Sequence, residues 1–314
     1  SPWIGHGLGS FEAHYLDYQA NFFKQCGQSR FSMLADNVKQ PFNEYLGLLL
    51  NFGIIGLLVL LLLMVIIIYC YRKNPSVEKQ IAFYSLSSIG IFSFFSYPFA
   101  YPFVWVVTFL SIFIITSEYI KPLFSNILIK KIACMFILTY SLFGSSKLFE
   151  RIQAELDWGK ASTLALCKSY NETLPTYERL EKMFVSNPYF LYNYAAVLQE
   201  MKQYTESLEV ALKCRQYWAD YDLELIIGEN YQQLNKPELA EKYYNSASMM
   251  CPSRFLPLYK LFHLYKTNGE KERSLAMAEA VISKPMKIKT TTIRMMKREM
   301  EREIQKMNMS IKLE

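Results

Sequence analysis

The longest stretch of apolar residues in the chain predicts its first membrane-spanning element. From Tyr45 to Tyr71 no charged residue occurs, and Arg72 and Lys73 follow at once. A helix rises about 1.5 Å per residue and a bilayer core is about 30 Å thick, so about 20 apolar residues are enough to cross it. The stretch therefore predicts a spanning helix at about residues 45–71.

A second uncharged region, from Gln80 to Ser117, is too long for a single span. Pro98 and Pro102 interrupt it near the middle, and proline ends or kinks a helix. We therefore expect a tight turn in the sequence SYPFAYPF, with aromatic residues at the membrane interface. A shorter apolar run after residue 131 can span if its flanking lysines extend to the interface. The four predicted spans are about 45–71, 80–97, 102–117 and 131–149.

Lysine and arginine are distributed unevenly among the short loops between these spans. Loops 72–79 and 118–131 carry three each, whereas the 98–101 turn carries none. Basic loops face the cytoplasm, so residues 1–44 and the part after residue 150 are expected on the outer side. If the fourth run does not span, the C-terminal part lies in the cytoplasm instead.

The chain from about residue 150 onward is polar, helical and repetitive. Small residues, aromatic residues, turns, alanines and prolines recur in it at an offset of 33 residues. This pattern resembles tetratricopeptide repeats, whose unit has about 34 residues. A degenerate earlier unit is expected from Trp158 to Asn187. The aligned positions are Ala195, Gly228 and Leu261, then Leu198, Tyr231 and Leu264, Ala247 with Ala280, Pro252 with Pro285, and the turns that begin at Asn235 and Asn268.

The end of the chain carries one apolar stripe at helical spacing, opposite a face of mixed Glu, Arg and Lys. Such a helix can close the solenoid by covering the core of the last repeat. The patterns together predict an all-α fold, in which polytopic transmembrane helices precede a soluble α-solenoid of tetratricopeptide-like repeats. The domains are expected at 1–44 (outward loop), 45–149 (spans) and 150–314 (repeats). The stripe comprises Ile293, Met296, Met300, Ile304 and Met307.

The composition and the placement of histidine and cysteine narrow the chemistry. The net charge of +6 is explained by Lys and Arg beside the spans, so nucleic-acid binding is not expected. His6, His14 and His263 lie far apart without carboxylates at ligand spacing, so no metal is expected. His263 is expected to pack inside a repeat or line its groove. The six cysteines lack CxxC spacing and are expected to be small buried residues, although the last three could form a disulfide outside the cytoplasm.

The expected outward loop contains two organised stretches. Glycines at alternate positions, Gly5, Gly7 and Gly9, predict a flexible turn. Residues 12–24 follow with aromatic residues at helical spacing, which predicts a short amphipathic helix near the membrane surface. The aromatic residues of this stretch are Tyr15, Tyr18, Phe22 and Phe23.

Two short motifs frame the entry to the first span. The first is Gly7-Leu8-Gly9-Ser10-Phe11, and the second joins Asn43-Glu44-Tyr45-Leu46 to Asn51-Phe52-Gly53-Ile54-Ile55-Gly56. Together they resemble the O-antigen ligase and polymerase family. The match covers about residues 1–60, and the later spans and the repeats fit by architecture. Because the first residues read as the middle of a loop, we expect the C-terminal part of a longer member with further helices upstream.

The resemblance implies transfer of a glycan from a polyprenyl-diphosphate carrier to an acceptor, at the outer face of the bacterial inner membrane. The acceptor would be lipid A-core, another glycan or a protein. The enzyme would be a glycosyltransferase that uses a lipid-linked oligosaccharide donor without metal or other cofactor. It would be multi-pass and in contact with membrane lipid, with its repeat domain in the periplasm.

The family also implies roles for residues of the outward loop. Its arginines bind the diphosphate, a role that suits arginine because the guanidinium binds oxygens in pairs and keeps its charge. Arg30 is the only arginine before the first span, so the resemblance assigns it to the donor. Gln40 and Asn43 are expected to bind substrate beside it.

The catalytic base is where this chain departs from the family pattern. The family has a histidine directly before the Asn, but here Gln40-Pro41-Phe42 precede Asn43, and a glutamine cannot act as a base. The alternatives are that Glu44 takes the role, that His6 or His14 folds back into it, or that the protein transfers poorly. For Arg30 and Glu44, anchoring at the membrane interface is the competing interpretation.

A different class of function also fits the sequence. On this alternative the protein is a non-catalytic, membrane-anchored tetratricopeptide scaffold for envelope assembly. Its repeats would bind a partner protein, or the growing glycan, on their concave face. A transporter is less favoured, because the spans lack the intramembrane ionisable residues that such pathways contain.

Overall fold

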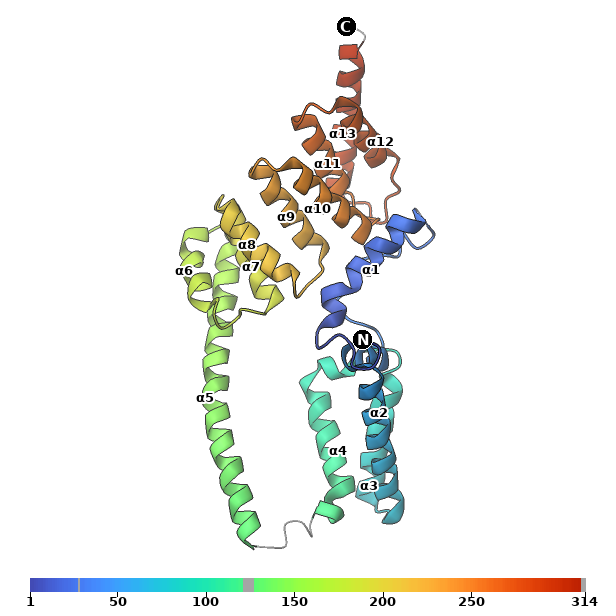
Figure 1. The fold of residues 1–314 in the computed structure, drawn as a ribbon, viewed down its shortest axis with the longest axis vertical. Coiled ribbons are helices and arrows are strands. Elements are labelled where there is room, and N and C mark those ends of the chain that lie inside the picture. The colour runs from blue at the N-terminus through green and yellow to red at the C-terminus, as the bar shows by residue number, and fades with distance from the viewer. Residues whose placement is uncertain (28, 121–126, 312–314) are drawn as a thin grey trace. The chain divides into compact units, whose positions relative to one another are not determined.

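The computed structural model describes residues 1–27, 29–120 and 127–311, and the regular elements in this part are helices (Figure 1). The chain forms two compact units, and one segment that interrupts the sequence of the first unit belongs to the second. The apolar unit comprises Ser1–Phe11 and Lys39–Gln153, and the repeat unit comprises Glu12–Val38 and Ala154–Glu314. The expected outward loop 1–44 is therefore divided between the units, because its middle part packs with the repeats.

The apolar unit contains three long helices and one shorter one. Among the described residues, three helices are long and apolar enough to cross a membrane, a statement that rests on length and composition alone. They agree with the predicted spans at 45–71, 102–117 and 131–149, and the last of these continues far beyond residue 149. The helices are α2 (Glu44–Lys73), α3 (Val77–Phe92), α4 (Pro102–Ile120) and α5 (Ile127–Leu166).

The helix predicted at 80–97 is shorter than expected. Helix α3 has 16 residues and ends at Phe92, and it is not among the three candidate spans. The backbone carbonyls of Ser93 and Phe94 are bound by residues at the start of α2 instead of continuing a helix. The expected turn in SYPFAYPF is confirmed as a single 3₁₀ turn, η1 (Pro98–Ala100).

The repeat unit consists of antiparallel helix pairs, as the 33-residue offset predicted. The turn inside each pair holds one residue with positive φ, namely Lys168, Lys202, Asn235 and Gly269, at intervals of 34, 33 and 34 residues. The first of these turns confirms the degenerate unit, in which the end of α5 pairs with the next helix. The remaining helices are α6 (Tyr170–Leu180), α7 (Pro188–Glu200), α8 (Tyr204–Arg215), α9 (Tyr221–Gln233), α10 (Pro237–Met250), α11 (Leu256–Thr267), α12 (Lys271–Ser283) and α13 (Thr291–Ile311).

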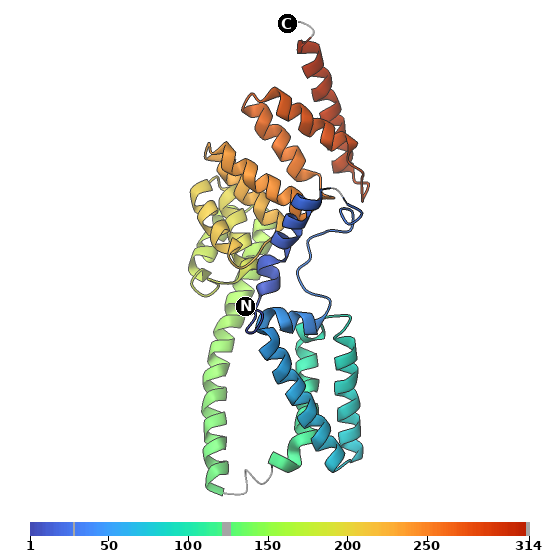
Figure 2. The ribbon, with the colours of Figure 1, turned by 45° about the vertical axis from the view of Figure 1, so that its right-hand side comes forward.

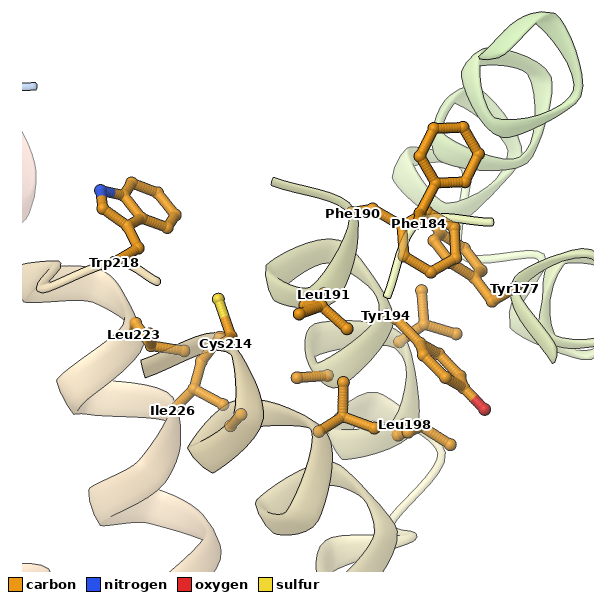
Figure 3. Packing of buried hydrophobic residues seen from close by; sticks show 14 of the residues in the cluster. Tyr177, Phe184, Phe190, Leu191, Tyr194, Leu198, Cys214, Trp218, Leu223 and Ile226 are labelled. Atoms are coloured by element: carbon orange, nitrogen blue, oxygen red, sulfur yellow. The ribbon is translucent and has the colours of Figure 1, made fainter. Parts of the chain in front are cut away.

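Each pair buries its apolar face against the next pair, and the buried residues form three successive repeat cores. In the first core, four aromatic rings from α6, α7 and the loop between them gather beside the aliphatic residues of α7, α8 and α9 (Figure 3). The rings of Tyr177 and Tyr194 stack at 5.5 Å between centroids, and those of Phe184 and Phe190 at 4.9 Å. Aromatic pairs at such distances add stability beyond the area that they bury.

The residue aligned between α7, α9 and α11 is buried in all three helices, as Ala195, Gly228 and Leu261. At Gly228 a Cβ atom would lie 2.6 Å from the ring of Tyr244, which is fully buried in α10. A glycine is therefore required here by the close approach of the two helices.

The last helix covers the end of the solenoid. The apolar stripe of α13 packs on Phe255, Phe262, Ala278 and Val281, which confirms the predicted capping helix. His263 is half-buried beside the rings of Tyr259 and Phe262, so it packs within the last repeat as expected.

The six cysteines are all free in this structure. Cys214 and Cys251 lie inside the repeat cores, whereas Cys167 is exposed. Burial raises the pKa of both buried thiols to about 12, from a usual value of 9.0. These two and the buried Cys70 behave as small apolar residues, as the sequence predicted, whereas the prediction is wrong for Cys26, Cys134 and Cys167, which are exposed.

Substitution of Gly228 by alanine should destabilise the repeat unit by about 1–3 kcal/mol, because the added methyl group overpacks a closed core. Thermal unfolding followed by circular dichroism should therefore show a Tm lower by several degrees. Gly159→Ala is the matched control, since a Cβ there meets nothing within 4 Å. An unchanged Tm in the Gly228 variant would contradict the close approach of α9 and α10.

The two buried thiols should resist alkylation. A pKa of about 12 leaves about a thousandfold less thiolate at pH 8 than the usual value of 9.0 allows. Iodoacetamide at pH 8, followed by peptide mass spectrometry, should modify Cys167 and leave Cys214 and Cys251 intact until the protein is denatured. Equal labelling of the three residues in the folded protein would refute this assignment.

Candidate functional site

The entry to α2 is built around a break in the helix. Gly53 has φ +65° and ψ −162°, and these angles interrupt the helical hydrogen bonds in an otherwise apolar helix. The first residues of the chain pair with the backbone groups that the break releases. The bonds run from His6 N–H to Leu50 O (2.9 Å), Gly7 N–H to Asn51 O (3.0 Å), Ile54 N–H to Pro2 O (3.0 Å) and Ile55 N–H to Trp3 O (3.1 Å).

This pairing explains why the irregular backbone is tolerated in a helix suited to a membrane. Unpaired N–H and C=O groups are costly away from water, and irregular segments occur there only where protein satisfies them. Gly5 and Gly53 are both required, because a Cβ on Gly5 would lie 2.5 Å from the carbonyl group of Asn51, and one on Gly53 would lie 2.4 Å from Trp3. Both also have positive φ, which favours glycine.

The two motifs of the sequence resemblance meet at this break. The Ser10 hydroxyl donates a hydrogen bond to Oδ1 of Asn51 at 2.9 Å, beside the backbone bond from Gly7 to the same residue. The predicted flexible turn is a defined one, because Gly5, Gly7 and Gly9 all have positive φ. Residues 1–10 are thus held against α2 by both backbone and side-chain contacts.

Asn43 and Glu44 join the start of α2 to the turn that follows α3. Asn43 accepts a backbone N–H of the first turn of α2 and donates from Nδ2 to Phe94 O at 3.1 Å. Glu44 accepts the N–H of Phe99 on Oε1 at 3.0 Å, and its own N–H donates to Ser93 O at 2.9 Å. Both ends of the Asn43 side chain are therefore occupied, whereas the Glu44 carboxylate is held by one oxygen.

The predicted site residues are divided between the two units. His6, Gln40, Asn43 and Glu44 belong to the apolar unit, whereas His14 and Arg30 belong to the repeat unit. His6 and His14 are exposed, and the Arg30 guanidinium lies 4.8 Å from the ring centre of Phe31. No group of three or more His, Cys, Asp or Glu side chains within the described residues could hold a metal ion.

A second site lies on the repeat unit, where residues 12–38 bind to the repeats. We call these residues the docked segment, and we call the turns between successive repeats, with the residues that border them (215–221, 250–255 and 284–290), the turn edge. Helix α1 (Ser10–Cys26) forms the first part of the docked segment and runs beside the ends of the repeat helices (Figures 1 and 2). Leu16 is 1% exposed and packs in a repeat core with Ala219, Tyr221 and Met250.

An ion-pair chain anchors α1 to the repeats. The guanidinium of Arg215, at the end of α8, pairs with Asp17 of the docked segment and with Glu224 of α9. Glu224 is 1% exposed, so its charge depends on this partner. Burial works against the charged arginine, but the two carboxylates raise the pKa of Arg215 above its usual value.

Successive repeats contribute equivalent contacts along the turn edge. The Ala219 N–H donates to Glu12 O at 2.9 Å, and Asn37 Nδ2 donates to Asp220 Oδ2 at 2.7 Å. One and two repeats further on, two basic side chains bind Asp36, whose pKa they lower despite its partial burial. These contacts are Arg254 Nη2 to Asp36 Oδ1 at 2.8 Å and Lys287 Nζ to Asp36 Oδ2 at 3.2 Å.

The sequence predicted helix α1 but placed its aromatic face near the membrane surface. In the structure Tyr18 is 66% exposed, while Leu16 and Phe23 are buried. The spacing of Leu16, Gln19 and Phe23, which are three and four residues apart, was the signal for a buried stripe. Arg215 and Arg254 could not be predicted as site residues, because nothing local to them in the sequence indicates a partner about 200 residues away.

No family model matches the chain, and no curated protein matches it. Its structural neighbours include YrrB, described as a TPR protein with an unusual peptide-binding site, at a TM-score of 0.37 and 19% identity over 41% of this chain and 66% of YrrB, just under two thirds. MamA gives 0.39 and 13% over 49% of this chain and 89% of MamA, and MamA 41-end from Desulfovibrio magneticus RS-1 gives 0.38 and 19% over 46% and 76%.

The class of the repeat unit follows from its own geometry. Its paired helices, its turn residues at a period of 33 or 34 and its capping helix define a tetratricopeptide-like helical repeat domain.

Substitution of Gly53 by alanine should loosen the loop at the entry to α2. The clash with Trp3 and the positive φ together cost about 1–3 kcal/mol, which corresponds to about tenfold or more in local opening. Hydrogen exchange followed by mass spectrometry should show faster exchange at the amides of His6, Gly7, Ile54 and Ile55. Gly144→Ala, where a Cβ meets nothing within 4 Å, should leave these amides unchanged. Equal protection in both variants would argue against the paired loop.

Proposed function

We propose that the protein is a membrane-anchored repeat scaffold that binds a partner protein through the turn edge. The observation that carries this proposal is that the turn edge already holds a segment from outside the repeats. It does so through the ion pairs of Arg215, Arg254 and Lys287 and through the burial of Leu16 in a repeat core. A surface that binds one helix by side chains and backbone groups can bind another of similar chemistry.

The scaffold proposal includes a place in the cell. The distribution of Lys and Arg among the loops, together with the resemblance at residues 1–60, supports a multi-pass protein of the bacterial inner membrane. On this proposal the repeat unit lies in the periplasm. The three long apolar helices are compatible with the anchoring part of the proposal.

A second candidate function is glycan transfer from a polyprenyl-diphosphate carrier to lipid A-core, another glycan or a protein. The contact between Ser10 and Asn51 favours it, because this contact joins the two motifs that resemble O-antigen ligases and polymerases. On this proposal Glu44 accepts a proton from the acceptor hydroxyl, with His6 or His14 as the alternative base. Arg30, with Gln40 and Asn43, would bind the donor, although the side chain of Asn43 is already engaged at both ends.

The two functions predict opposite results for two variants of the gene in its native host. Glu44→Gln removes the base but keeps an oxygen that can accept the Phe99 N–H. The pair Arg254→Glu and Lys287→Glu reverses the charge of the turn edge at exposed positions. The pair Lys202→Glu and Lys236→Glu is its matched control, on exposed lysines in the turns inside two helix pairs, at the other end of the repeat helices.

After deletion of the gene, each variant should be tested for restoration of the surface glycan on gels and of lipid-linked intermediates by mass spectrometry. We expect a scaffold to work with Glu44→Gln and to fail with the turn-edge pair. The reverse result would contradict the scaffold and support glycan transfer, with complete polymer on the carrier indicating a ligase and single units a polymerase. If deletion changes neither the surface glycan nor the carrier pool, the glycan-transfer candidate is refuted.

A further inference from the structure

We propose that the turn edge is a recognition site for acidic segments of a partner protein, in which an amphipathic helix is followed by an extended acidic stretch, and that the docked segment is a built-in ligand which such a segment displaces. This inference rests on the proposed scaffold function and names the chemistry of its partner. It is argued from the sorting of charge, the apolar anchor and the way the docked segment is attached.

Charge is sorted between the two faces of the docked segment. Its carboxylates are Glu12, Asp17 and Asp36, and each of them contacts the repeats. Its cationic side chains, Lys24 and Arg30, are exposed. The turn edge therefore selects acidic groups and leaves basic groups outside.

The basic groups of the turn edge are arranged in register with the repeats. Arg254 and Lys287 are 33 residues apart, and Tyr221 occupies the same position one repeat earlier, with the Arg254 guanidinium 5.9 Å from its ring centre. Because successive repeats present equivalent positions at regular spacing, the site can follow an elongated ligand. The ligand in this structure uses that register, since one carboxylate, Asp36, binds both basic residues.

The apolar contact of Leu16 makes the site specific for one sequence pattern in its ligand. Leu16 enters the repeat core directly beside Asp17, while Tyr15 and Ala20 are partly buried around it. Gln19 donates its side-chain amide to the Met250 carbonyl at the end of α10. The recognised pattern is therefore an acidic residue, a leucine four positions later, an aspartate directly after it and a glutamine two positions further.

The repeats do not need the docked segment to close most of their core. The first and last of the three repeat cores contain no residue from it, and the middle core takes Leu16 as its one fully buried side chain from the segment. The remaining links are hydrogen bonds and ion pairs, and the ion pairs join partly exposed groups and contribute little individually because water screens them. The segment is held mainly by its high local concentration, since it is joined to the chain at both ends.

The test uses the full chain in detergent or nanodiscs and a synthetic peptide of residues 10–38. Its single cysteine, Cys26, is exposed and can carry a fluorophore, so binding is read from anisotropy. We expect weak binding to the wild-type chain, because its own segment competes. A chain with Leu16→Asp and Asp17→Lys, in which that segment is released, should bind the peptide at least tenfold more tightly. Asp17→Lys alone is the second variant if the pair folds poorly.

Two controls test the chemistry of the site. A peptide with Asp17→Lys and Asp36→Lys should bind at least tenfold more weakly than the native peptide. In the released chain, Arg254→Glu with Lys287→Glu should lower the affinity by a similar factor, whereas Lys202→Glu with Lys236→Glu should not change it.

The proposal is overturned if a correctly folded released chain binds no peptide, or if it binds native and charge-reversed peptides equally well. Its failure is distinguishable from failure of the scaffold function. Peptide binding with the expected charge dependence, in a protein whose turn-edge variants still restore the host phenotype, would leave the site established and the scaffold role refuted.

Discussion

The buried carboxylate of Glu224 is the constraint on which the arrangement of the repeat unit depends. A charge at 1% exposure is tolerated only when it is paired, and the partner must come from the neighbouring helix. Arg215 meets this need from the end of α8, and the planar guanidinium has donors left over for a second carboxylate. Asp17 takes that position. A pairing requirement inside the repeats has thus produced the group that holds a segment from elsewhere in the chain.

The apolar unit solves a different problem by a similar exchange. Its first long helix is broken at Gly53, and the break releases backbone groups that need partners elsewhere in the protein. The opening residues of the chain pair with these groups, and Gly5 permits the approach. Asn43 and Glu44 then fix the start of the same helix to the turn near Phe99. The residues that suggested a catalytic loop therefore also stabilise the fold. Glu44→Gln separates the catalytic role of Glu44 from its structural role, because glutamine keeps an oxygen for the Phe99 N–H.

Local and periodic features of the fold could be predicted from the sequence. The repeat offset, the turns at Asn235 and Gly269 and the stripe that includes Met300 each depend on neighbours within one or two helices, and the structure confirms them. The length of α3 could not be predicted, because its end depends on bonds from the start of α2. The site on the repeat unit was harder to predict from the sequence for the same reason. The partners of Asp17 and Asp36 lie about 200 residues away, and periodicity carries no information about such contacts.

The attachment of the docked segment at both ends has a mechanical consequence. In the sequence, residues of the apolar unit come directly before Glu12 and directly after Val38. The segment is therefore a loop that only non-covalent contacts hold on the repeats. Folded onto the repeats it is short, since a helix such as α1 rises about 1.5 Å per residue. Fully extended, the same residues could reach up to about 90 Å. The segment therefore stores slack, and its release from the repeats would turn a short folded element into a long, flexible tether.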